Sequence, residues 1–389
     1  MSVRFKLLTA VTSPDTSIKG NAPRYVHGLC TALLFGALFV LPAMVFAQAD
    51  DQSARLIPLP SPQQGLSFGL HWDTDIYDNL DGGVKRGYAT DSVLSLGFGL
   101  DTGALGAWPG GQFALGLQSI TSTHPSEYVG DIQTLSNLDA PNRRQVAEFW
   151  YSQAFGSALV RAGVMDVNSF FDVNDIASLF TNSSFGITPS ITANVPTATY
   201  PDSAWGMMAQ FGADKNGWLV GIFQGDPEHR STALDGGEML IAERDWRAAT
   251  GGTQLGIGGW YRRVPVASGV PASDWGAYAN LEQPLPNHPD TSAFVQIGAS
   301  PGEVNTVPVY LGGGIRFQNV SPGVSDLGFG FARAWIRGQA AETSVETTAL
   351  IPIGSGYFAL QPDIQYVFHP SGIYPNAFVA ALRLHLTLY

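Results

Sequence analysis

The sequence predicts an all-β protein whose strands close into a membrane barrel, and three observations indicate this fold class. Only 13% of the 389 residues are charged, roughly half the share of an average soluble domain, whereas 45% are apolar. The 22 Phe, 13 Tyr and 9 Trp supply more aromatic surface than a disordered chain contains. Beyond residue 48 no apolar run reaches the roughly 18 residues of a membrane-spanning helix, so a helical membrane protein is excluded.

The first segment has the features of a secretory signal peptide. A basic stretch precedes an apolar one over residues 29–45, and small residues follow. We expect residues 1–47 to be removed by cleavage after Ala47, with Ala49 as the alternative, and residues 48–65 to form a short extension. A membrane anchor is the competing interpretation, but Pro42 interrupts the apolar stretch and no basic stop-transfer residues follow it.

The cysteine content and the charge of the mature chain exclude a disulfide framework and a nucleic-acid partner. The single cysteine, Cys30, lies within the leader, so no disulfide framework is available. Removing residues 1–47 takes away four of the 20 basic residues and one of the 32 acidic residues, which leaves a net charge of −15. No basic stripe is present to meet phosphates, so nucleic acid is excluded as a partner.

Apolar and polar side chains alternate along most of residues 66–389, which predicts strands with one apolar face. The opposite face carries Gly, Gln, Asp and Arg, as expected for an apolar outside and a polar, water-filled inside. The segments with this alternation are 66–74, 91–101, 112–121, 146–154, 158–165, 203–213, 217–224, 254–263, 274–282, 291–299, 308–317, 326–337, 343–352, 356–367 and 376–388. Because closed bacterial barrels have an even number of strands, we expect sixteen, the missing one lying in the second half or in 226–253.

Long connections alternate with short ones, as in barrels with tight turns at one side of the membrane. Residues 75–90, 122–145, 166–202 and 225–253 form long gaps, whereas 155–157 and 214–216 are short. The connection at about 166–202 is the most informative, because a loop of this length inside a compact protein is usually functional.

Several segments resemble the carbohydrate-selective porins of the OprB family, over roughly residues 60–389. The segments are 129–137, 148–151, 161–168, 180–186 and 360–366, together with Pro370 and Gly372. The resemblance implies a 16-stranded barrel of the bacterial outer membrane through which sugars diffuse passively, without a cofactor. By analogy with trimeric porins, the loop after the fifth strand is then a constriction loop. One departure is that Leu388 holds the last apolar position and the terminal Tyr389 lies one residue beyond it.

A pore that favours sugars needs hydrogen-bond donors and acceptors in opposition, aromatic surface, and binding weak enough for the solute to leave. The residues expected to line the eyelet or contact the solute are Glu148, Trp150, Arg161, Asp166, Asn168, Asp172, Asn174, Gln361, Asp363 and Gln365. Each has a structural alternative, because charges facing a porin lumen also form pairing ladders. Trp150 has a further one, as an aromatic residue of the interface girdle.

Metal binding and catalysis find little support in the sequence. The spacing from Asp166 to Asn174 is like the start of an EF-hand, but Phe171 and Ala177 replace the required Gly and Glu, and only another type of calcium contact stays open. No cluster of His and Cys suggests zinc. His71 and His385 face the lumen by alternation, and no histidine lies on an apolar face beside a serine as a barrel lipase would require.

The sequence therefore predicts an outer-membrane porin that passes mono- or small oligosaccharides and contacts outer-membrane lipids. A general porin of low selectivity, with mild cation preference, is the alternative. A barrel enzyme and a soluble β-rich binding protein are more remote interpretations. Both a monomer and a homotrimer are compatible with the sequence.

Overall fold

The computed structural model describes residues 65–389 except 214, 232–235, 249–251, 264–272 and 355–356. The expected signal peptide, residues 1–47, and all but the last residue of the expected extension lie outside the described residues. The described part of the chain forms sixteen strands in one closed barrel. The strands are β1 (Leu66–Asp81), β2 (Gly87–Asp101), β3 (Gly111–Ser122), β4 (Arg143–Phe155), β5 (Ala158–Met165), β6 (Ala204–Ala213), β7 (Asn216–Gln224), β8 (Glu238–Arg247), β9 (Gln254–Arg263), β10 (Ser273–Leu285), β11 (His288–Ala299), β12 (Val309–Ser321), β13 (Val324–Trp335), β14 (Glu342–Ile353), β15 (Phe358–Phe368) and β16 (Ala377–Leu388).

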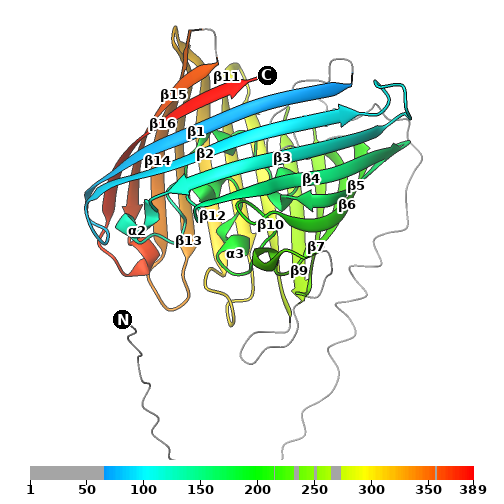
Figure 1. The fold of residues 1–389 in the computed structure, drawn as a ribbon. Helices are drawn as coiled ribbons and strands as arrows, with labels where there is room; N and C mark the ends of the chain where they lie inside the picture. Colours follow the sequence, from blue (N-terminus) through cyan, green and yellow to red (C-terminus); the bar gives the residue numbers. More distant parts are fainter. Residues whose placement is uncertain (1–64, 214, 232–235, 249–251, 264–272, 355–356) are drawn as a thin grey trace, which may run out of the picture. The chain divides into compact units, whose positions relative to one another are not determined.

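Each strand pairs antiparallel with its neighbours in the chain, and β1 closes the barrel by pairing with β16. Leu70 lies opposite Leu388 and Ile76 lies opposite Leu382 in this closing pair. Figure 1 shows β1 and β16 side by side. Closure removes the edge strands, so the backbone N–H and C=O groups of the wall bond to one another, as a bilayer requires.

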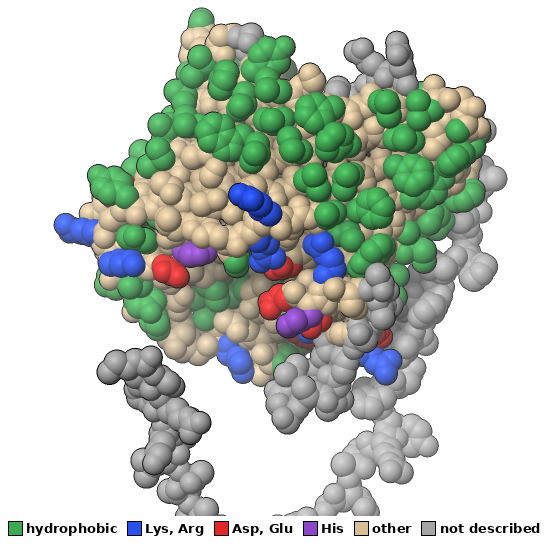
Figure 2. All heavy atoms as spheres, viewed as in Figure 1, with side chains coloured by type: hydrophobic (Ala, Val, Ile, Leu, Met, Phe, Trp, Pro, Cys, Tyr) green, Lys and Arg blue, Asp and Glu red, His purple; other side chains and the backbone are tan. Residues whose placement is uncertain are grey.

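The two faces of the wall differ in polarity, as the alternation predicts. Outward side chains such as Phe98, Phe149 and Ile364 are exposed, whereas inward ones such as Gln118 and Glu346 are buried. Figure 2 shows hydrophobic side chains spread over the outer surface, with charged side chains and histidines gathered below them. An apolar outer band of this kind matches the hydrocarbon core of a membrane.

Two sequence expectations about the strands can now be judged. The missing strand is β8, which lies within 226–253, one of the two regions named for it. The expectation of a long connection at 75–90 is wrong, because β1 continues to Asp81 and only residues 82–86 join it to β2. Residues 75–81 contain polar side chains such as Asp75 and Asn79, which are typical of a loop. In the structure both side chains face inward and are buried.

In the described parts of the connections, the helices are short turns. These are α2 (Ser126–Val129), η2 (Val167–Ser169), η3 (Ala177–Leu179), η4 (Ser183–Phe185), α3 (Pro189–Thr192), η5 (Pro227–His229) and η6 (Pro370–Gly372). Among the described residues, no helix has the length and apolar character needed to cross a membrane.

The connection between β5 and β6, residues 166–203, is called the inner loop below, because it packs against the inward face of the wall. Phe180 and Phe185 of this loop form a buried apolar cluster with Phe294 of β11 and Tyr310 of β12. Gly330 of β13 makes this close approach feasible, since a Cβ there would lie 2.9 Å from both loop rings. The glycines of the inward face therefore make room for the loop.

Candidate functional site

Asp166 closes the base of the inner loop. Its Oδ1 accepts hydrogen bonds from the Asn168 backbone N–H at 2.7 Å and the Thr199 hydroxyl at 2.8 Å. Its Oδ2 accepts from the backbone N–H of Tyr200 at 2.8 Å. Burial raises the pKa of Asp166, although these hydrogen bonds act in the opposite direction.

Asn168 ties the two halves of the inner loop together. Its side-chain Nδ2 donates to the backbone oxygens of Phe171 at 3.2 Å and Asp172 at 3.3 Å. The same nitrogen donates to the backbone oxygen of Gly186, eighteen residues further along the chain, at 3.0 Å. The side chain of Asn168 thereby links η2 to the residue that follows η4.

Asp172 fastens the loop to the wall. Its backbone N–H donates to Glu243 Oε2 of β8 at 2.8 Å, and its Oδ1 accepts from Asn280 Nδ2 of β10 at 2.8 Å. Its Oδ2 accepts from the backbone N–H of Thr188 at 2.7 Å. Burial raises the pKa of Asp172 to about 6, because the hydrogen bonds to its carboxylate only partly offset the loss of water.

Asn174 and Asp175 continue this attachment. Asn174 Oδ1 accepts from the backbone N–H of Ala177 at 2.9 Å. The backbone N–H of Asp175 donates to Glu282 Oε1 of β10 at 3.0 Å, and its carboxylate bonds the ammonium of Lys215. The Asp175 side chain is 51% exposed, so its carboxylate is in contact with water.

A second attachment lies across the barrel, on β14 and β15. Glu346 accepts hydrogen bonds from the backbone N–H groups of Thr181 at 2.6 Å and Asn182 at 3.1 Å. Gln365 Nε2 donates to Thr181 Oγ1 at 3.0 Å, and its Oε1 accepts from Asn182 Nδ2 at 3.2 Å. Because β8 and β10 hold residues 172–175 and β14 and β15 hold residues 179–182, the middle of the loop follows the inward face of the wall from β8 to β15.

Gln361 and Asp363 belong to this second attachment. Gln361 Nε2 donates to the backbone oxygen of Leu179 at 2.6 Å and to Thr348 Oγ1 at 2.9 Å. Asp363 Oδ1 accepts from Gln365 Nε2 at 3.2 Å. Gln361 and Gln365 of β15 therefore position the inner loop, and Asp363 supports Gln365.

Arg161, Trp150 and Glu148 lie together on β4 and β5 and are buried. The Arg161 guanidinium carbon lies 4.3 Å from the ring centre of Trp150 and 4.5 Å from that of Phe170 of the inner loop. Such stacking is a favourable cation–π arrangement. Trp150 is 2% exposed, so it faces inward and is not a girdle residue.

The connection between β3 and β4, residues 123–142, is called the second loop below and was given no role by sequence reasoning. Its backbone N–H groups at Ile132 and Gln133 donate to Glu342 of β14 at 2.9 and 3.0 Å. It meets the inner loop where the Asn137 N–H donates to the Thr181 oxygen at 2.7 Å. Both loops therefore occupy the interior together.

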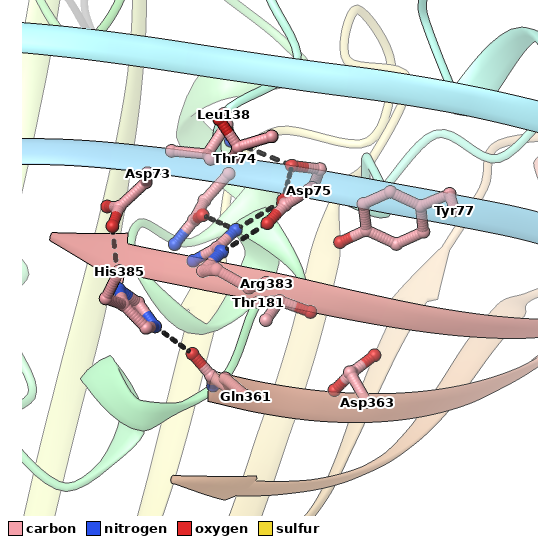
Figure 3. A network of polar contacts seen from close by, with 12 residues as sticks. Asp73, Thr74, Asp75, Tyr77, Leu138, Thr181, Gln361, Asp363, Arg383 and His385 are labelled. Atoms are coloured by element: carbon pink, nitrogen blue, oxygen red, sulfur yellow. Dashed lines mark hydrogen bonds and ion pairs between the residues drawn. The ribbon is translucent and has the colours of Figure 1, made fainter. Parts of the chain in front are cut away.

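Figure 3 shows a polar network on the wall formed by β1, β15 and β16. Arg383 donates to both carboxylate oxygens of Asp75, at 2.6 and 2.7 Å. Next to this pair, His385 Nδ1 lies 2.7 Å from Asp73 Oδ1 and its Nε2 lies 2.8 Å from Gln361 Oε1. The pair and the histidine thus place both signs of charge on one inward face.

A recess lies beside the inner loop, between that loop and the inward faces of β6 to β10. Its lining includes carboxylates, amides and a lysine, namely Asp175, Glu243, Asp245, Glu282, Gln210, Gln254, Asn280 and Lys215. Phe170 and Val173 of the loop contribute apolar surface. The recess can therefore offer hydrogen-bond acceptors, donors and apolar contact to a small solute.

The structure places the ten residues expected at the eyelet in the interior, where most of them contact the inner loop, the wall or one another. Nine of them are buried and Asn168 is half-buried, and none of the ten lines the recess. Contact of these ten side chains with a solute stays a prediction. The recess carboxylates were missed, because Arg244 lies between Glu243 and Asp245 on β8 and interrupts the alternation of polar and apolar residues.

Comparisons with known proteins agree with this architecture. The sequence model described as "Carbohydrate-selective porin, OprB family" matches residues 85–388. The high-pH structure of Pseudomonas putida OprB superimposes with a TM-score of 0.74 at 17% identity, over 84% of this chain and 94% of that one. The low-pH structure gives 0.55 at 16% identity, over 84% and 93%, and a mutant of Rhodopseudomonas blastica porin gives 0.52 at 10% identity, over 83% and 100%. No curated protein matches the sequence.

Proposed function

The chain belongs to the OprB family of carbohydrate-selective porins, and on that premise we propose that small neutral sugars diffuse through its barrel along the recess beside the inner loop. Family membership makes it a non-enzymatic channel of the outer membrane, which sets aside the barrel enzyme and the soluble binding protein. Diffusion down a gradient requires neither an energy source nor a cofactor.

The observation that carries the proposal is the attachment of the inner loop to two separate regions of the wall. The loop bonds Glu243 and Asn280 on one side and Glu346 and Gln365 on the other. A segment fixed in this way narrows the lumen, so we assign residues 166–202 as the constriction loop. A rigid constriction suits selection among solutes better than a mobile one, because the lining groups keep their positions.

The chemistry of the recess suits a polyhydroxylated solute. Carboxylates accept hydrogen bonds from sugar hydroxyls, while the amides of Gln210 and Gln254 can donate as well as accept. The side chain of Phe170 offers a surface for the C–H face of a sugar ring. Shallow, partly solvated contacts of this kind bind weakly, which a pore requires so that the solute leaves.

A general porin with cation preference is the second candidate, because carboxylates predominate over lysine in the recess lining. In either case Asp172, Gln361 and Gln365 position the inner loop. The cleavage of residues 1–47 stays a prediction, and both a monomer and a homotrimer are compatible with the proposed pore.

Planar-bilayer conductance, titrated with glucose and then with longer glucose oligomers, tests the sugar pore. The chain should show saturable block, and Asp175→Asn should raise the half-blocking concentration about five- to tenfold, because the 51% exposed carboxylate loses a charged hydrogen bond to the solute. Asparagine keeps the backbone bond to Glu282.

The matched control is Asp290→Asn, since Asp290 is also exposed and hydrogen-bonded but lies outside the recess. The half-blocking concentration of glucose should be the same for Asp290→Asn as for the unmodified chain. Current that no sugar reduces, together with a cation-selective reversal potential, would favour the general porin instead.

A further inference from the structure

Two histidines and one aspartate meet on the inward face of the closing strand pair. His71 and Asp73 lie on β1, and His385 lies on β16 directly opposite Asp73 in the register. His71 and His385 are 314 residues apart in the sequence, so no local motif joins them. They come together only because the first and last strands pair. Sequence reasoning therefore found no zinc cluster.

The three side chains converge on one small volume. His71 Nε2 lies 2.8 Å from Asp73 Oδ2, and His385 Nδ1 lies 2.7 Å from Asp73 Oδ1. The three candidate ligand atoms all lie within 4.8 Å of one another. A metal ion with bonds of about 2 Å to nitrogen and oxygen would require only a small adjustment of this arrangement.

The partners of His385 leave a place for a cation between its Nδ1 and Asp73. Gln361 Nε2 donates to the backbone oxygen of Leu179, so Gln361 Oε1 must be an acceptor for His385 Nε2–H. In the neutral ring the proton is then on Nε2, and the lone pair of Nδ1 faces a carboxylate oxygen. Two acceptors at 2.7 Å repel each other unless a proton or a metal ion lies between them.

The outer nitrogens of both rings are already held, as in established metal sites. His71 Nδ1 bonds Thr387 Oγ1 at 2.8 Å, and His385 Nε2 bonds Gln361 Oε1 at 2.8 Å. Such outer partners fix the ring orientation and strengthen the metal-binding nitrogen. The side chains of His71, Asp73 and His385 are 28%, 13% and 20% exposed, so water can reach the remaining coordination position.

We propose that His71, Asp73 and His385 form a binding site for a divalent transition-metal ion on the lumen wall, with Zn²⁺ as the probe. Two imidazole nitrogens and one carboxylate oxygen are a ligand set that Zn²⁺ accepts, with a fourth position open to water. The site lies at the end of the barrel where β1 begins and β16 ends, apart from the recess proposed for sugars.

Isothermal titration of the tag-free, folded chain in detergent with Zn²⁺ tests the site. We expect one Zn²⁺ per chain, and visible absorption bands of a low-coordinate site when Co²⁺ replaces it. His71→Ala and His385→Ala should each raise the Kd for Zn²⁺ at least tenfold. Loss of an outer hydrogen-bond partner of a ligand already weakens metal binding by about this factor, so loss of the ligand itself should weaken it at least as much. Thr387→Val should raise the Kd about tenfold while leaving all three ligands in place.

His124→Ala is the matched control, because His124 bonds a single carboxylate, Asp139, at 2.8 Å and belongs to no cluster with a second histidine in the part of the chain that the structure describes. It should bind Zn²⁺ like the unmodified chain. Heat-modifiable gel mobility establishes that each variant is folded, and His385→Gln replaces His385→Ala if the latter does not fold. Zn²⁺ binding no stronger than in the double variant His71→Ala/His385→Ala, or binding lost in His124→Ala alone, would overturn the site.

Discussion

At the scale of single residues, the buried carboxylates of the wall serve as anchors for backbone N–H groups of the loops. Glu243 accepts from Asp172, Glu342 from Gln133, and Glu346 from Thr181. Two such hydrogen bonds compensate much of the free-energy cost of burying a carboxylate. They also give the backbone N–H groups of the loops hydrogen-bond partners that a strand would otherwise supply. The inward face is thus polar for a structural reason as well as a functional one.

The buried ion pair between Arg383 and Asp75 gives the first prediction. Arg383→Ala should lower the free energy of unfolding by about 3–5 kcal/mol, because it leaves the Asp75 charge buried without its partner. Arg86→Ala removes the arginine of an exposed pair with Asp81 and should cost less than about 1 kcal/mol. Urea unfolding in lipid vesicles measures both, and equal losses would contradict this assignment.

Asp172 gives a prediction of pH dependence. Its pKa of about 6 in the folded chain exceeds the ordinary value of about 3.9, so the folded state binds the proton more tightly than the unfolded state. Asp172 therefore contributes stability that is fully present below about pH 3.9 and is lost as the pH rises to about 6.

Asp172→Asn tests this dependence because asparagine cannot ionise. Asn280 Oδ1 has no hydrogen-bond partner among the described residues, so a rotated Asn280 amide could accept from the new side chain. Between pH 4 and 7 the unfolding free energy of the original chain should fall relative to the variant by about 2–3 kcal/mol. A constant difference across this range would show that Asp172 does not titrate as proposed.

At the scale of elements, the constriction role that we propose for the inner loop gives a prediction about the size of the pore. Deleting residues 170–184 removes the attachments to Glu243 and Glu346 together with the rings of Phe171 and Phe180. Single-channel conductance should then rise, because less of the lumen is filled. Deletion of the exposed turn residues 103–107 between β2 and β3 should leave it unchanged. Unchanged conductance after deletion of residues 170–184 would contradict the assignment of the inner loop as the constriction.

The strands were largely predictable because each must present an apolar face to lipid at every second residue. That constraint acts on each strand by itself, and β5 and β9 are found with the expected bounds. It failed where inward residues were strongly polar, as in the second half of β1, and where the chain offered fewer alternating positions, as in β8. Polarity inside a barrel is easily mistaken for a loop.

The candidate site was less predictable, because alternation shows that a side chain faces inward but not what covers it. Gln361 and Gln365 face inward as expected, yet the inner loop lies over them and uses their amides. The course of the loop depends on contacts between residues far apart in the sequence, such as Thr181 with Glu346. A single sequence contains no direct signal for these contacts.

At the scale of the whole molecule, closure of the barrel brings distant residues onto one inward face and gives the two loops a common interior to occupy. The wall supplies carboxylates on β8, β10 and β14, and the inner and second loops supply the N–H groups that meet them. The recess beside the inner loop is the space that we propose for the solute. Selectivity is therefore a property of the assembled interior.

Solute entry into proteoliposomes tests the central claim, selection of sugars by this interior, most directly. Swelling rates would be compared for glucose, for a linear polyol of the same size, and for a cationic amino acid of similar size. The account predicts that glucose enters several-fold faster than the polyol, because the recess offers oriented polar groups and apolar surface to a ring. Rates ordered by size and charge alone, with glucose and the polyol equal, would contradict it.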